Sequence, residues 1–131
     1  MTDKFEHAKH NAQGWFEEIQ GMLDAFQRAE ADNDLAAQDD ARQTIEESVL
    51  SVLVRDGWHA PGQLSDDGAE EYEILLSTGG PALRIYGRLG RYGEPTTAEL
   101  QMQDWSLPWT RYEVSDEDIL LRFVSFFYFG E

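Results

Sequence analysis

The chain has 131 residues, of which 26 are acidic and ten are basic, so its formal net charge at pH 7 is −16. Its length is typical of a single domain, and a 41% content of hydrophobic residues supports a folded core. The charge argues against direct binding of nucleic acids or anionic membranes, which would repel the chain, and favours a basic protein or nucleoprotein partner. The alternative explanation of the negative charge is that it only keeps the chain soluble. The absence of cysteine excludes disulfides and thiolate metal sites and fits a cytoplasmic protein.

Residues 4–31 carry apolar side chains at alternating steps of three and four, which predicts a long amphipathic helix. The apolar positions are Phe5, Ala8, Ala12, Trp15, Phe16, Ile19, Met22, Leu23 and Phe26. We expect this stripe in the core, with the seam of a homodimer as the alternative. Residues 32–34 read as a break with an N-cap, followed by a second helix over residues 35–49. Its expected inward positions are Leu35, Ala41, Ile45 and Val49.

The outer faces of both expected helices are acidic. Residues 1–48 hold twelve acidic and four basic residues. A calcium-binding loop is excluded at Asp32 and Asp34, because the required glycine and the distal glutamate are missing. The acids therefore form either a solvated face or a docking surface. The candidate partner-binding residues are Glu17, Glu18, Asp24, Asp39, Asp40, Glu46 and Glu47.

The middle of the chain has the alternation of β-strands. Residues 48–58 predict a first strand, with Val52 and Val54 on the face opposite Leu53 and Arg55, and residues 63–71 read as a loop. Residues 71–89 predict a hairpin that turns at residues 77–80, where a glycine pair suits a tight turn. Its return strand places two sets on opposite faces: Leu83, Ile85 and Leu89, and Arg84, Tyr86 and Arg88.

Residues 97–105 predict a fourth strand, with Ala98, Leu100 and Met102 inward and Glu99, Gln101 and Gln103 outward. An aromatic connector at residues 105–109 is expected over a sheet edge. Residues 115–118 have the spacing of a capping box, and a largely apolar last helix is expected over residues 116–128.

These elements predict one α+β domain over residues 1–131. Its acidic helical part is expected at residues 1–49, a four-stranded antiparallel meander at residues 50–105, and a C-terminal helix at residues 115–129 on one face of the sheet.

No catalytic, cofactor-binding or metal-binding residues are predicted. His7 and His10 are three residues apart on the first helix but have no evident third ligand. His59 and Asp56 could form an acid–base pair, yet no nucleophile matches them.

The open face of the sheet is the alternative candidate for binding. Arg84, Tyr86, Arg88, Gln101 and Gln103, joined by Arg55, would form a basic and aromatic patch. Alternatively, these arginines pair with Glu73 and Glu99 on neighbouring strands.

The chain also carries two distinctive segments, S-T-G-G-P-A-L-R-I-Y-G-R-L and A-E-L-Q-M-Q-D-W-S-L-P-W-T-R-Y, and closes with F-F-Y-F-G-E. Together they resemble a family of small, uncharacterised proteins from proteobacterial phages and other mobile elements, over about residues 51–131. The resemblance implies no activity or site residues. It implies a bacterial host cytoplasm and a setting in which small acidic proteins block host defence by imitating nucleic acid.

We therefore expect a non-enzymatic inhibitor of anti-CRISPR or anti-restriction type, whose acidic helices occupy a basic nucleic-acid-binding surface. The alternative is a protein–protein interaction module of a mobile element that binds through Arg84, Tyr86 and Arg88. A third hypothesis is an enzyme that uses His59 and Asp56.

Overall fold

The computed structural model describes residues 4–56, 58, 60–61, 69–78, 81–104 and 108–129. Within these residues, helices α1 (Lys4–Ala31) and α2 (Leu35–Glu47) precede a sheet, and helix α3 (Glu117–Val124) follows it. The strands are β1 (Ser51–Asp56), β2 (Ala69–Ser77), β3 (Ala82–Arg88), β4 (Glu99–Gln103) and β5 (Thr110–Tyr112). They pair antiparallel in chain order, as a meander. The expected α+β layout is confirmed, with five strands instead of four.

The additional strand, β5, was not predicted from the sequence. It has three residues, which is too few for a two-residue alternation to stand out. Gln101 pairs with Arg111, so β5 brings Arg111 onto the same face of the sheet as Gln101.

Helix α1 has the predicted bounds, and its apolar stripe packs inside the chain. Ala8, Ala12 and Ile19 are fully buried and Phe16 is nearly so. The buried positions of the stripe are therefore part of the core within one chain, whereas Trp15, Met22 and Phe26 are half-buried.

Helix α2 begins as predicted, because the Asp34 carboxylate accepts a hydrogen bond from the Ala37 amide at 3.1 Å. It ends at Glu47 instead of residue 49. Ile45 is fully buried, but Leu35 is 74% exposed, so its predicted inward position is wrong. Leu35 directly follows the turn between α1 and α2. No third element among the described residues is present there for its side chain to pack against.

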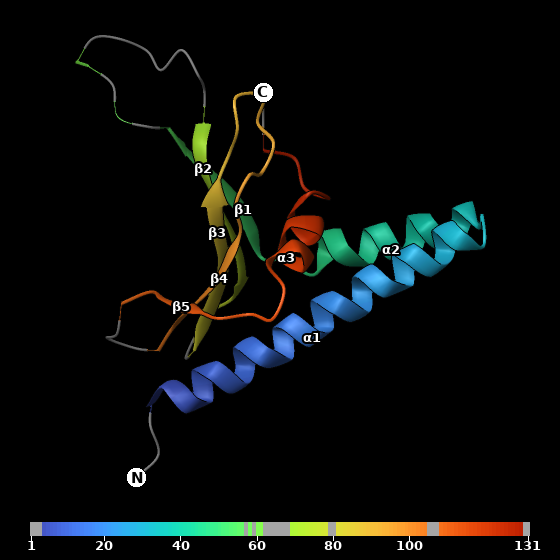
Figure 1. The fold of residues 1–131 in the computed structure, drawn as a ribbon, viewed down its shortest axis with the longest axis horizontal. Helices are drawn as coiled ribbons and strands as arrows, with labels where there is room; N and C mark the ends of the chain where they lie inside the picture. The colour runs from blue at the N-terminus through green and yellow to red at the C-terminus, as the bar shows by residue number, and fades with distance from the viewer. Residues whose placement is uncertain are drawn as a thin grey trace.

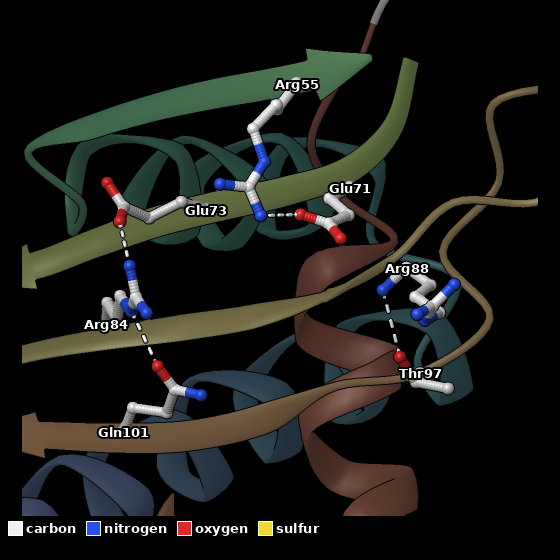
Figure 2. A network of polar contacts seen from close by, with 7 residues as sticks. All are labelled: Arg55, Glu71, Glu73, Arg84, Arg88, Thr97 and Gln101. Atoms are coloured by element: carbon white, nitrogen blue, oxygen red, sulfur yellow. Dashed lines mark hydrogen bonds and ion pairs between the residues drawn. The ribbon is translucent and has the colours of Figure 1, made fainter. Parts of the chain in front are cut away.

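The sheet buries one face and leaves the other open. Ile74, Leu83, Ile85 and Leu100 are fully buried on the face that the helices cover, and the predicted inward positions of β3 and β4 are confirmed. Figure 2 looks onto the open face, with the helices behind the sheet.

Several strand bounds differ from the expected ones. β1 and β4 are shorter than predicted, and β2 begins at Ala69, inside the expected loop. Strand pairing extends β2 there, because Ala69 and Glu71 find partners in β1 and polar composition does not prevent pairing. The predicted glycine-pair turn lies at residues 79–80, outside the described residues.

Helix α3 is shorter than predicted and begins one residue later. Its N-cap is Asp116, whose carboxylate accepts a hydrogen bond from the Asp118 amide at 3.0 Å, in place of Ser115. The helix ends at Val124, and the residues after it pack as an irregular segment. The ring of Phe126 meets that of Phe26 at 5.0 Å, and the ring of Phe129 lies 4.8 Å from that of Tyr72.

The helices give the molecule two distinct parts (Figure 1). The first half of α1 lies beside the sheet, whereas its second half and α2 form a helical hairpin that extends away from the sheet. We call residues 17–47 the projecting hairpin. None of the helices in the described residues has the length and apolar character needed to cross a membrane.

Candidate partner-binding surfaces

The projecting hairpin carries a concentrated negative charge. It holds ten acidic and two basic residues, a net charge of −8. All seven predicted partner-binding acids on it are exposed: Glu17, Glu18, Asp24, Asp39, Asp40, Glu46 and Glu47. Every ion pair within the described residues lies on the sheet, so these seven carboxylates have no basic partner there.

The hairpin is held in place by contacts at its base and between its helices. The guanidinium of Arg42 in α2 lies 5.6 Å from the ring centre of Phe26 and 5.8 Å from that of Phe126. The Gln38 amide donates to the carbonyl oxygen of Ala29 at 3.3 Å. One of the hairpin's two basic side chains, Arg42, thus packs against aromatic rings. These contacts link α2 both to α1 and to the segment after α3.

A shallow hollow of about 360 Å³ lies between the two helices of the hairpin. Met22, Ala25 and Ala41 give it an apolar floor, and Glu18 stands at its side. Gly21 also lines it, and a methyl group at Gly21 would meet no atom within 4 Å. The acidic surface therefore includes a small apolar depression.

The open face of the sheet collects charges of both signs. The residues that strand pairing places on this face include Arg55, Glu71, Glu73, Arg84, Tyr86, Arg88, Glu99, Gln101, Gln103 and Arg111. The structure thus brings together the residues predicted for the sheet face. It adds acids between them, so the face is close to neutral instead of basic.

Arg84 stands at the centre of this face and is fully engaged (Figure 2). Its Nη1 lies 2.5 Å from a carboxylate oxygen of Glu73, and its Nε donates to Gln101 at 2.7 Å. Its guanidinium also lies 4.3 Å from the ring centre of Trp109 and 5.2 Å from that of Tyr86. The side chain is 18% exposed, so Arg84 orders the face and has little surface left for a partner.

The aromatic connector at residues 105–109 was expected over a sheet edge; its residues 105–107 lie outside the described residues, and Trp109 lies elsewhere. Its ring lies against Arg84 of β3, the central strand. The guanidinium attracts the ring electrostatically, and no periodic pattern in the sequence announces such a contact.

The remaining arginines of the face differ in their partners. Arg55 pairs with Glu71, and Arg111 lies 3.7 Å from both Glu99 and Glu113. Arg88 is exposed, and its backbone amide donates to the Thr97 hydroxyl at 2.9 Å. The alternative interpretation of the sequence, cross-strand pairing with Glu73 and Glu99, therefore describes Arg84, whereas Arg55 pairs with a glutamate that was not predicted, Glu71.

Three ionisable groups on this face have shifted pKa values: Arg55, whose pKa is raised by its pair with Glu71, Glu71 itself and Tyr86. The hydrogen bond from Arg55 lowers the pKa of the Glu71 carboxyl. Partial burial and the neighbouring Glu71 carboxylate raise the pKa of Tyr86. Glu71 is thus held in its charged form and Tyr86 in its neutral form.

A second hollow, of about 410 Å³, opens on this face between β1, β2 and β3. Leu53 and Tyr86 contribute apolar surface, and Arg55, Glu73 and Arg84 contribute charged groups. The hollow therefore suits a side chain with both apolar and polar parts.

The residues considered for catalysis or metal binding are described only in part. His7 and His10 are exposed on α1, and Asp56 is exposed at the end of β1. His59 lies outside the described residues. In the part of the chain that the structure describes, no three His, Asp or Glu side chains are grouped to hold a metal ion. Asp104 is buried, and its Oδ1 has no hydrogen-bond partner within that part.

Comparison of the chain with known proteins identifies no relative. No family model matches the chain, and no curated protein or solved structure matches it either.

Proposed function

We propose that the protein is a non-enzymatic inhibitor that docks its projecting hairpin on a basic, nucleic-acid-binding surface of another protein. The class of partner to test first is a bacterial defence nuclease, either a CRISPR effector or a restriction enzyme. The observation that carries the proposal is the set of exposed hairpin carboxylates that have no basic partner within the described residues.

The charge density of the hairpin supports this choice of partner. At 1.5 Å per residue, residues 17–31 of α1 extend about 22 Å, and α2 returns along them. A net charge of −8 over this length is about one charge per 3 Å. Single-stranded nucleic acid carries about one charge per 3.4 Å and duplex DNA about one per 1.7 Å. The hairpin is therefore closer to a single strand in charge density.

The position of the acids also supports the proposal. Because the two helices fix the backbone positions of these acids, little backbone conformational entropy is lost when a partner binds. Exposed charges interact over roughly a Debye length, about 8 Å at physiological salt, so the complex should weaken steeply as salt rises.

The experiment is an inhibition assay with purified defence nucleases and two matched triple variants. One variant removes hairpin charge by Asp39→Asn, Asp40→Asn and Glu46→Gln. The control removes the same charge elsewhere by Glu6→Gln, Asp56→Asn and Glu113→Gln. All six side chains are exposed.

The expected result is inhibition by the native protein and by the control. The hairpin variant should need at least about tenfold more protein, which corresponds to about 1.4 kcal/mol of lost binding. Equal inhibition by both variants, or no inhibition of either class of nuclease, would contradict the proposal.

A second candidate function is a mobile-element interaction module that binds through the sheet face. The hollow beside Tyr86 favours it, because an aromatic side chain at a hollow is a common interface anchor. Combined Tyr86→Ala and Arg88→Ala changes should then abolish partner capture, whereas the hairpin variant should leave capture intact. Arg84 is unsuitable for this test, because it holds Glu73 and Gln101.

A further inference from the structure

The two edges of the sheet differ in how they are protected. Exposed strand edges offer unpaired backbone groups, and proteins usually shorten or charge such edges. β5 follows this rule: it has three residues, and Arg111 at its centre lies near Glu99 and Glu113.

β1, at the other end of the strand order, is less protected, because its charged residues, Arg55 and Asp56, are only its last two. It has six residues, and no described strand pairs with its outer side. Leu53 is 57% exposed and Val54 is 47% exposed, and Leu50 just before the strand is 59% exposed. A register irregularity follows Arg55, so only the last residue of the edge departs from regular pairing.

We propose that β1 pairs antiparallel with β1 of a second copy of this chain, around a two-fold axis at Leu53. The two sheets then become one continuous sheet. In this register Leu53 faces the partner's Leu53, Val52 faces the partner's Val54, and Ser51 faces the partner's Arg55. The inference is independent of the inhibitor function, because it uses none of the hairpin acids.

The register follows from the faces of the strand. Paired residues in a continuous sheet must lie on the same face, so the two residue numbers in each pair must both be odd or both be even. Pairing at Leu53 satisfies this rule and overlaps residues 51–55, five of the six residues of each strand.

The side chains in this register are complementary. On the helix-covered side, Val52 already pairs with Ile74, and the partner's Val54 would extend this apolar row. On the open side, Arg55 is neutralised by Glu71 of its own chain and would face a serine. No two like charges stand opposite each other.

The net charge predicts an unusual salt dependence. Two chains of charge −16 repel each other, and salt screens that repulsion. Dimerisation through β1 should therefore strengthen with salt, whereas binding of a basic partner by the hairpin should weaken.

The first test is the mass of the full chain by sedimentation velocity at about 0.05 and 0.5 M salt, a range that shortens the Debye length severalfold. A 15.0 kDa chain should shift toward twice that mass as salt and protein concentration rise. Leu53→Lys should abolish the shift. The matched control is Leu35→Lys. It changes an exposed leucine that lies on α2 instead of β1, and it should leave the dimer intact.

The second test reads the register with single cysteines, which is possible because the chain has none of its own. Under mild oxidation Leu53→Cys should form an intermolecular disulfide at least about tenfold faster than Ser51→Cys, because only position 53 faces itself.

Three outcomes of these two tests would overturn the inference. They are a monomer under every condition, equal cross-linking at positions 51 and 53, and assemblies larger than two chains. If β1 amides become protected from hydrogen exchange only when a different protein binds, the edge belongs to that protein and the inference also fails.

Discussion

The projecting hairpin and the open sheet face use the same charged residue types in different ways. On the sheet, Glu71 and Glu73 are paired with arginines of neighbouring strands, and their charges help to fix the pairing. On the hairpin, the seven carboxylates have no basic partner among the described residues, so they form no ion pair that stabilises the fold there. Charge on the sheet is therefore structural, whereas charge on the hairpin is available for binding.

The largest contrast is expected between two glycine substitutions. In Gly87→Ala on β3, the new Cβ would lie 2.0 Å from the carbonyl oxygen of Thr97 and 2.7 Å from the Tyr72 hydroxyl. These two groups are hydrogen-bonded to each other at 2.7 Å, so the backbone at Thr97 and the side chain of Tyr72 must move away from β3. We expect a loss of about 3 kcal/mol in the free energy of unfolding, measured by urea denaturation.

The matched change on the helix is Gly14→Ala. A Cβ at this exposed position of α1 meets no atom within 4 Å. We expect a gain of about 1 kcal/mol, because alanine is the better helix former. Changes of the same sign at both glycines would contradict this prediction.

The next effect distinguishes an engaged arginine from an exposed one. Arg84→Met leaves Glu73 and Gln101 without their partner, and we expect a loss of about 2 kcal/mol. Arg55→Met removes a side chain that is 72% exposed, so its loss should be clearly smaller than that of Arg84→Met. Equal losses in the two denaturation curves would show that Arg84 has no special structural role.

A smaller effect concerns acid stability. Arg55 lowers the pKa of Glu71, so their pair contributes stability above the ordinary glutamate pKa of about 4.3. This contribution is lost as the pH falls through the lowered pKa. The stability difference between the native chain and Arg55→Met should therefore be present at neutral pH and vanish at low pH. A difference that persists in acid would indicate lost packing instead.

The smallest change is expected on the hairpin. The triple variant Asp39→Asn, Asp40→Asn and Glu46→Gln should keep the free energy of unfolding within about 0.5 kcal/mol of the native value. A slight gain at low salt would reflect reduced repulsion between like charges. A loss comparable to that of Arg84→Met would show that these acids are structural after all.

The sequence predicted the parts of the fold that repeat a pattern many times. The bounds of α1 and the two faces of β3 follow from such repeats. β5 could not be found, because three residues contain no measurable period. Leu35 fits the helical spacing of α2 but is exposed, because inward position depends on a neighbouring element as well as on period.

The candidate surfaces were predictable to different degrees. The outward position of the hairpin acids follows from helical geometry alone. The ion pairs of the sheet require the register between strands, which places Arg55 opposite Glu71 although they are far apart in the sequence. The contact between Trp109 and Arg84 depends on the path of a connection, and composition carries no information about that path.

The continuity of α1 has a geometric consequence. Its 28 residues form one unbroken helix, about 42 Å long, that begins beside the sheet and ends at the turn of the hairpin. The length of this helix therefore fixes the distance between the two candidate surfaces. A single macromolecule that bound both surfaces would have to present its two docking sites at that distance.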